Sequence, residues 1–228
     1  MTNFQTRQCK GEAVGKLVIG AIPTIAPYIL PRLLPEFWQE HPKVTIEVVE
    51  DVTENLARGV EAGELDLALL STWQNPEFLV QAVGEEPLLV AAPVGHRLAT
   101  RRCVTWDDLK GERFLALHRV HCLSKQVDRL CETYGLQPEF SVRGSQLNTI
   151  LGMVNVGLGI TLVPQMLVAE HATKSCSFLP FAHPAPTREL NVIRNPQRFQ
   201  SKASLLFIAM LASNLAETTF FHRAPAKV

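Results

Sequence analysis

Residues 16–70 read KLVIGAIPTIAPYILPRLLPEFWQEHPKVTIEVVEDVTENLARGVEAGELDLALL, and the order of apolar and amphipathic stretches in this segment predicts the fold class. Three apolar runs of strand length alternate with two amphipathic stretches of helix length. In chain order they are strand Lys16–Ile22, helix Tyr28–Glu40, strand Val44–Glu50, helix Thr53–Ala62 and strand Leu65–Leu70. The alternation predicts parallel strands joined by right-handed helical crossovers, which form an α/β layer.

Single residues mark where the elements of this first layer begin and end. Thr53 is expected to cap its helix and Gly63 to end it. Thr24 lies in the turn that follows the first strand, where a hydroxyl side chain is common. Pro31 and Pro35 crowd the first turns of the Tyr28–Glu40 helix, so the pattern does not specify where that helix starts.

The rest of the chain predicts a second α/β unit and a return to the first. The expected elements are strand Pro87–Pro93, a turn of helix at Trp106–Lys110, strand Phe114–Leu117, helix Leu123–Tyr134, strand Glu139–Arg143, helix Leu147–Val156, strand Ile160–Val163, a short helix after Pro164, strand Leu190–Arg194 and helix Lys202–Glu217. The last helix is apolar nearly all round, so we expect it to lie against the first sheet or a partner subunit.

These elements suggest two subdomains with the chain crossing between them near 86–88 and 187–190. We expect subdomain I to comprise residues 15–86 and 190–220, and subdomain II to comprise residues 87–189. Residues 1–14 are expected to be a linker remnant and residues 221–228 a C-terminal tail. A junction between two α/β units is a common place for small ligands to bind.

Composition excludes several classes of function. Lys and Arg number 22 and Asp and Glu number 22, so the formal net charge is zero. A nucleic-acid-binding domain usually has a pI above about 9 with clustered basic residues, so any DNA contact is expected to come from another part of the protein. The longest uninterrupted apolar run, Leu205–Ala212, is too short to span a membrane, and the first residues lack the apolar core of an export signal.

The five cysteines favour a reducing compartment, so we expect the protein to be cytoplasmic. Cys9, Cys103, Cys122, Cys131 and Cys176 are an odd number and contain no CxxC pair. His118, His121 and Cys122 form one close cluster, but no second cluster completes a tetrahedral zinc site. We therefore expect neither a metal nor another cofactor.

Cys122 lies at the start of a predicted helix, a position that makes a cysteine more reactive. It begins a predicted helix, whose unpaired N–H groups and dipole stabilise an anion, and His121 and Lys125 can add positive charge. Such surroundings favour the thiolate, the form that peroxides oxidise to sulfenic acid. The alternative is that Cys122 is a small packed hydrophobe, which is the commoner role for a cysteine in a helix.

Cys131 is the nearest second thiol, but an intact helix keeps it away from Cys122. Nine residues of α-helix separate the two by about 13 Å along the axis and place them on opposite sides. A disulfide requires Cα atoms within about 7 Å, so the intervening helix would have to unwind. The pair is thus either a redox switch or two structural cysteines.

The segments GKLVIGAIPTIAPYILPRLLPEFWQEHP, GELDLALL, EEPLLVAAPVGHRLA, DDLKGERFLAL and GLGITLVP together resemble the regulatory domain of LysR-type transcription regulators. The resemblance runs from about Gly15 to about Glu217. His121-Cys122-Leu123 with Cys131 nine residues later is similar to the OxyR peroxide sensors within that family. It implies a periplasmic-binding-protein-like α/β fold of two Rossmann-like subdomains joined by two crossover strands, and a helix-turn-helix DNA-binding domain ahead of residue 1.

The resemblance also implies roles for individual residues. Cys122 matches the peroxide-reacting cysteine, Cys131 its resolving partner and His121 the histidine before the reactive cysteine. Thr24 and Thr53 match the threonines that position peroxide, and Arg188 aligns with an arginine that favours the thiolate. The family usually reads Gly-His-Cys-Leu-Arg-Asp-Gln, whereas this chain has Val120, Ser124 and Lys125 at the differing positions, which is expected to change how readily the helix unwinds.

The implied function is stoichiometric sensing of hydrogen peroxide rather than enzymatic turnover. The implied partners are a second copy of the chain in a homodimer or dimer of dimers, DNA and RNA polymerase through the full-length protein, and a glutaredoxin- or thioredoxin-type reductant that resets the disulfide. No membrane partner is expected.

Three alternative functions remain at this point. One is a LysR-type domain that binds a small organic anion and has structural cysteines. A thiol peroxidase that recycles Cys122 would need a reductant-recycling site, which no CxxC-type motif suggests. A periplasmic solute-binding protein is disfavoured by the missing export signal.

Overall fold

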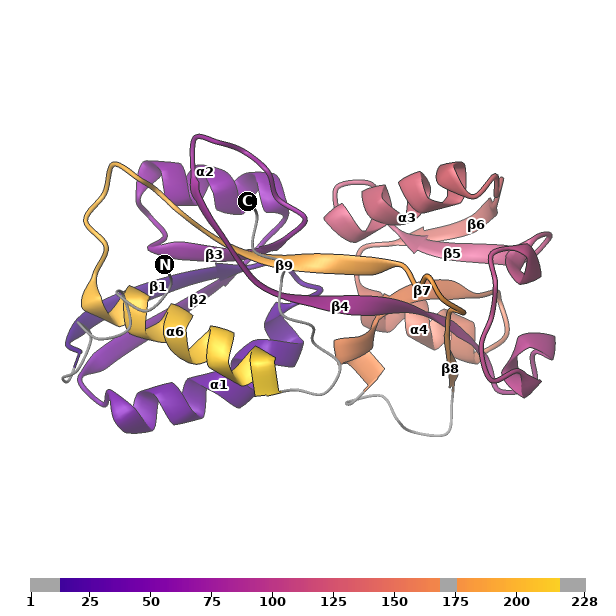
Figure 1. Ribbon diagram of the computed structural model, residues 1–228, viewed down its shortest axis with the longest axis horizontal. Coiled ribbons are helices and arrows are strands. Elements are labelled where there is room, and N and C mark those ends of the chain that lie inside the picture. Colours follow the sequence, from indigo (N-terminus) through magenta and orange to yellow (C-terminus); the bar gives the residue numbers. More distant parts are fainter. Residues whose placement is uncertain (1–12, 169–175, 218–228) are drawn as a thin grey trace. The chain divides into compact units, whose positions relative to one another are not determined.

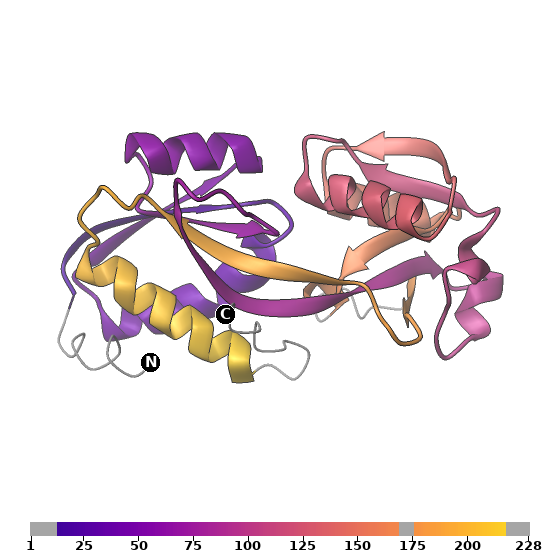
Figure 2. The same cartoon turned by 45° about the horizontal axis from the view of Figure 1, so that its top comes forward.

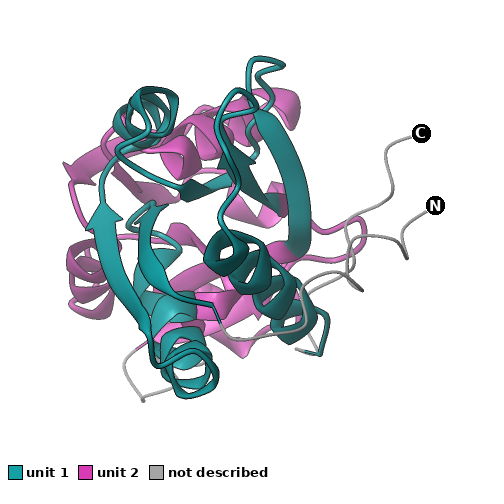
Figure 3. Ribbon diagram, turned by 90° about the vertical axis from the view of Figure 1, so that its left-hand side faces the viewer, with its two compact units in different colours: residues 1–85, 189–228 teal, residues 86–188 magenta. Residues whose placement is uncertain are grey.

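The computed structural model describes residues 13–168 and 176–217, which form two compact units (Figure 3). Unit 1 comprises residues up to Glu85 together with those from Glu189 onward, and unit 2 comprises Glu86–Arg188. The chain therefore passes from one unit to the other twice, once within each of two long strands. Cys9 and the tail expected at 221–228 lie outside the described residues, as does most of the linker expected at 1–14.

Unit 1 has the parallel layer that residues 16–70 predict (Figure 1). Strand β1 pairs in parallel with β2 on one side and β3 on the other, and β9 adds an antiparallel strand beyond β3. The elements of this unit are β1 (Gly15–Ala21), α1 (Ala26–Glu40), β2 (Val44–Glu50), α2 (Thr53–Ala62), β3 (Leu67–Ser71), the first half of β4 (Leu79–Pro93), most of β9 (Thr187–Arg194) and α6 (Lys202–Glu217). Right-handed crossovers place α1 and α2 on opposite faces of the sheet, as Figure 2 shows.

The final helix packs against the first sheet, which is one of the two positions expected for it. Helix α6 contacts α1 and β1, and the ring of Phe207 meets the ring of Phe37 edge-on at 5.4 Å between centroids. Both phenylalanines are fully buried, so they join the helix to the core of unit 1.

Unit 2 contains two groups of strands. The second half of β4 pairs antiparallel with β7 and with β8, while β5 and β6 form a parallel pair. Its further elements are η1 (Arg97–Thr100), η2 (Asp107–Leu109), β5 (Arg113–Leu117), α3 (Cys122–Thr133), β6 (Glu139–Gly144), α4 (Leu147–Asn155), β7 (Thr161–Pro164), η3 (Gln165–Leu167) and β8 (Cys176–Pro180). Helices α3 and α4 both contact β5.

Most predicted elements agree with the structure, and the differences have local causes. The sequence placed the start of β4 at Pro87, but the strand begins at Leu79; its first half, LVQAVGEE, contains Gln81, Glu85 and Glu86, which interrupt the apolar run. Strand β8 was not expected. Helix α1 begins at Ala26, so Pro31 and Pro35 lie inside it rather than in its first turn.

The prediction that Thr53 caps α2 is wrong. The N-cap is Val52, and Thr53 is already the first helical residue. The side chain of Asp51 makes the polar contacts at the start of the helix instead. Its Oδ1 accepts hydrogen bonds from Val52 N at 2.7 Å and from Asn55 Nδ2 at 2.8 Å. Gly63 does end the helix, in a left-handed conformation (φ 74°) that glycine adopts without strain.

Candidate functional site

Cys122 is the first residue of α3, as the sequence predicts. His121 is the N-cap in an extended conformation and makes no capping bond with its side chain. Its carbonyl accepts hydrogen bonds from the backbone N–H groups of Ser124 and Lys125. Cys122 is of intermediate exposure and lies at the end of a helix that stabilises negative charge.

Cys131 lies in the last turns of the same helix and is buried, with 2% of its surface exposed. Burial, followed by the negative charges of Asp128 and Glu132, raises the pKa of the Cys131 thiol to about 11. This thiol is therefore protonated at neutral pH and a weak nucleophile while the helix persists. Cys122 and Cys131 are both present as thiols, at opposite ends of an unbroken helix.

Other side chains of α3 bind the loop and strand around it. Ser124 is buried, and its hydroxyl donates to the carbonyl of Leu117 at 2.8 Å. The Gln126 amide donates to the carbonyl of Thr187 at 2.7 Å. The segment that would have to unwind is thus held by hydrogen bonds on more than one side.

His121 is buried beside the reactive position, but it is not a source of positive charge at neutral pH. Burial and the neighbouring His118 lower the pKa of His121 from its usual 6.5, and a hydrogen bond with the Ser145 backbone only partly opposes them. The expectation that His121 adds positive charge near Cys122 is therefore wrong at neutral pH. A neutral imidazole can still accept or donate one hydrogen bond.

Arg188 is wholly buried in unit 2 and forms an ion pair with Glu86. Its Nε and Nη2 donate to the same carboxylate oxygen, Oε1, while the other oxygen accepts from the backbone N–H of Met166 at 2.8 Å. Burial raises the pKa of Glu86, while the charge of Arg188 and the Met166 N–H act in the opposite direction. The guanidinium is thus paired with a buried carboxylate, a partner that sequence analysis did not predict.

Thr24 and Thr53 belong to unit 1, where they follow β1 and β2. Because these strands are parallel, their carboxyl ends reach the same edge of the sheet. Both threonines are buried. Among the described residues, the Thr53 hydroxyl has no hydrogen-bond partner. A buried hydroxyl without a partner is unusual in a folded protein and often marks a place where a small polar molecule binds.

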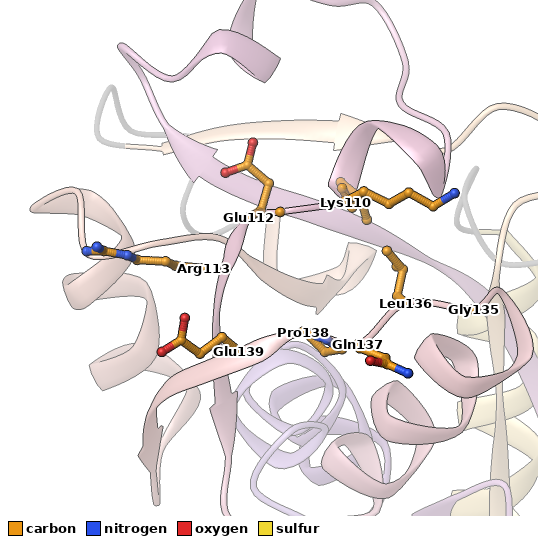
Figure 4. A pocket seen from close by; sticks show the side chains of 10 residues that line it. Lys110, Glu112, Arg113, Gly135, Leu136, Gln137, Pro138 and Glu139 are labelled. Carbon is orange, nitrogen blue, oxygen red and sulfur yellow. The ribbon is translucent and has the colours of Figure 1, made fainter.

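A separate pocket of about 320 Å³ lies in unit 2 at the starts of β5 and β6 (Figure 4). Lys110, Glu112, Arg113 and Glu139 line it together with the loop that follows α3. None of the predicted site residues lines this pocket. Within residues 13–168 and 176–217, no group of three or more His, Cys, Asp or Glu side chains could hold a metal ion, and no helix is long and apolar enough to cross a membrane.

Comparison with known proteins gives consistent matches. Residues 10–216 match the family described as the LysR substrate binding domain. The hydrogen peroxide-inducible genes activator of Escherichia coli O157:H7 is 34% identical over 190 residues, which cover 82% of this chain and 62% of that protein. The chain therefore spans less than two thirds of the length of this relative.

Solved structures of OxyR in two redox states resemble the fold. The reduced form has a TM-score of 0.81 with 29% identity and covers 90% of this chain and 97% of its own. The oxidised form has a TM-score of 0.78 with 28% identity and covers 90% of this chain and 98% of its own. These matches agree with the two-subdomain, periplasmic-binding-protein-like α/β fold that the sequence implied.

Proposed function

The chain belongs to the LysR family through its substrate-binding domain, and we propose that it is the hydrogen peroxide-sensing regulatory domain of a transcription regulator. The similarity to peroxide-inducible activators and to OxyR in reduced and oxidised forms supports this assignment. The observation that carries it within the chain is the position of Cys122 at the start of α3, with Cys131 buried at the other end of the same helix.

The first step oxidises Cys122. Its thiolate attacks one oxygen of hydrogen peroxide, the O–O bond breaks, and the departing hydroxide takes up a proton to leave as water. The product is a sulfenic acid on Cys122, which has lost two electrons to the peroxide. The exposed N–H groups at the start of α3 favour the thiolate that this step requires.

The second step forms a disulfide with Cys131. The Cys131 sulfur, as thiolate, attacks the Cys122 sulfur and displaces hydroxide, which leaves as a second water once protonated. Two thiols are thus oxidised to one disulfide while one hydrogen peroxide is reduced to two waters. Because the two cysteines lie about 13 Å apart along an ideal helix, α3 has to unwind before the sulfurs meet.

The unwinding of α3 would be the signal. We propose that it changes the arrangement of a homodimer or dimer of dimers and so alters how the rest of the protein binds DNA and RNA polymerase. A cytoplasmic glutaredoxin- or thioredoxin-type reductant would return the disulfide to two thiols. We also propose that Arg188, Thr24 and Thr53 take part in the reaction of Cys122 with peroxide, and that His121 does so as a neutral imidazole.

Peroxide titration with thiol mapping tests the assignment. One equivalent of hydrogen peroxide should convert Cys122 and Cys131 to a disulfide, detected by mass spectrometry of unreduced peptides. Cys122→Ser should abolish fast peroxide consumption, and Cys131→Ser should stop the reaction at sulfenic acid. Cys103→Ser, at an exposed cysteine outside α3, is the matched control and should behave like the parent.

Two results would contradict the proposal. Peroxide consumption by Cys122→Ser at the parent rate would show that another thiol reacts. Thiols that remain unmodified at micromolar peroxide, together with a small organic anion that raises the melting temperature, would favour the effector-binding alternative instead.

A further inference from the structure

Arg143 of β6 connects its strand to the helix that carries both cysteines. Its Nη1 donates to the Ser124 hydroxyl at 3.0 Å and to the Leu117 carbonyl at 3.3 Å. Its Nη2 lies 3.4 Å from Oδ1 of Asp128. Helix α3, β5 and β6 lie together in unit 2 (Figure 1), so one guanidinium contacts the helix at two points and the end of β5 at a third.

The surroundings of Arg143 make these contacts stronger than an ordinary surface ion pair. The side chains of Arg143 and Asp128 are only 22% and 20% exposed, so solvent screens their attraction less. The guanidinium also lies over the Phe140 ring, 4.3 Å from its centroid, which fixes its orientation. Arg119 forms a second ion pair with Asp128 at 3.2 Å, but that arginine is 75% exposed.

Both helix contacts lie between the two cysteines. Ser124 and Asp128 are four residues apart, and this spacing places them on one face of α3 only while the helix is intact. Unwinding of the segment from Cys122 to Cys131 would move Ser124 and Asp128 apart. Arg143 could not then keep both contacts.

We propose that Arg143 is a positioning residue that holds α3 in its helical form, and that its release from Ser124 and Asp128 limits the formation of the Cys122–Cys131 disulfide. The proposal rests on the function proposed above. It assigns to Arg143 control over the second step, whereas the reaction of Cys122 with peroxide occurs at the helix start and does not require these contacts to break.

The helical form that these contacts hold also keeps Cys131 unreactive, because burial in the folded helix is the main cause of its raised pKa. Asp128, which Arg143 holds against the helix, is one of the charges that raise the pKa of the buried Cys131 thiol. When the helix opens, the thiol loses both its burial and the fixed position of this carboxylate. The release of α3 therefore frees Cys131 to move and at the same time makes it a better nucleophile.

Arg143→Met tests the proposal with little risk to the fold. Methionine keeps an apolar stem over Phe140 and removes every donor. Ser124 still has the Leu117 carbonyl and Asp128 still has Arg119, so no buried group loses its last partner. Arg129→Met is the matched control, because Arg129 is exposed on the same helix and no ion pair of its side chain is found among the described residues. Arg143→Lys restores one charged donor.

Two measurements separate this proposal from the proposed function. The first uses diamide, an oxidant that takes two electrons and two protons from a pair of thiols and so forms the disulfide without peroxide. The rate of Cys122–Cys131 closure is followed by mass spectrometry. The second is hydrogen–deuterium exchange of the α3 amides in the reduced protein, which reports opening of the helix with no oxidant present.

We expect Arg143→Met to close the disulfide about tenfold faster than the parent and to exchange its α3 amides faster by a similar factor, since charged hydrogen bonds to the helix are lost. The amides of β5 and β6 should exchange at the parent rate, and Arg143→Lys should give intermediate values. Consumption of the first equivalent of peroxide should not change.

Parent-like closure and exchange in Arg143→Met, relative to Arg129→Met, would overturn the proposal. Faster exchange throughout unit 2 would also overturn it, since Arg143 would then be a general stabilising residue. Faster closure with diamide in a protein that does not react with peroxide would uphold the role of Arg143 and reject the proposed function.

Discussion

Arg188 and Glu86 form an ion pair that is inaccessible to solvent, with Nη2 and Nε of the arginine 2.7 and 2.8 Å from the same carboxylate oxygen. The two residues are the last and the first of unit 2, so the pair joins the two segments through which the chain enters and leaves that unit. A charge this deeply buried is tolerated only while its partner is present.

Arg188→Met should therefore destabilise the protein by about 3–5 kcal/mol, because it leaves the Glu86 carboxylate buried without its counter-charge. The double variant Arg188→Met with Glu86→Leu should recover most of this loss, since no charge then remains in the core. Urea unfolding followed by circular dichroism measures both. A double variant no more stable than the single one would show that the arginine acts through packing alone.

The stability of the protein should fall as the pH drops below about 6.5, in part because of His121. Its pKa is lowered in the folded state, so the unfolded chain binds a proton first as the pH falls, and protonation favours unfolding. Thermal unfolding from pH 7.5 to 5 should show a smaller pH dependence for His121→Gln than for the parent. His183→Gln, at an exposed position, is the control and should keep the parent slope.

Cys131 should resist alkylation in the folded, reduced protein. Burial raises its pKa to about 11, so at pH 8 almost none of this thiol is ionised and little of it is accessible. Iodoacetamide should modify Cys122 and the exposed Cys103 first, and Cys131 only when urea is added. Peptide mass spectrometry resolves the order, and equal rates for Cys103 and Cys131 without urea would contradict it.

Thr53→Val should slow the reaction with peroxide by about tenfold and leave the later closure of the disulfide unchanged. The variant removes a hydroxyl that we propose positions peroxide, and one lost hydrogen bond in a reacting complex costs about this factor. Thr53→Ser should retain the parent rate. Stopped-flow peroxide kinetics test this, with Thr45→Val on the exposed side of β2 as the control.

Thr53→Val should also be at least as stable as the parent. Its hydroxyl is buried and has no partner among the described residues, so an apolar group of the same shape removes an uncompensated desolvation cost. If Thr53→Val is more stable than the parent but reacts more slowly with peroxide, Thr53 serves the reaction rather than the stability of the fold. A loss of stability would instead indicate that the hydroxyl has a structural partner.

Local sequence signals predicted the bounds of a helix or strand correctly where those bounds depend on one short stretch of chain. Apolar runs and helical periodicity predicted β1, β2 and α3 to within two residues, and Gly63 correctly marked the end of α2. The cap at Thr53 failed because the Asp51 side chain makes the local polar contacts instead. The first half of β4 was missed because Gln81, Glu85 and Glu86 interrupt its apolar residues.

Sequence analysis predicted the α/β class, the position of Cys122 at the start of a helix and the presence of Cys131 beyond reach on that helix, because each depends on neighbours within a few residues. The partners of the charged groups became known only from the three-dimensional structure. Arg143 lies 15 residues after Asp128 and Arg188 lies 102 residues after Glu86, and no local pattern shows which charges meet. Packing brings the two residues of each pair together. Burial then determines the strength of the ion pair and the cost of removing one of its partners.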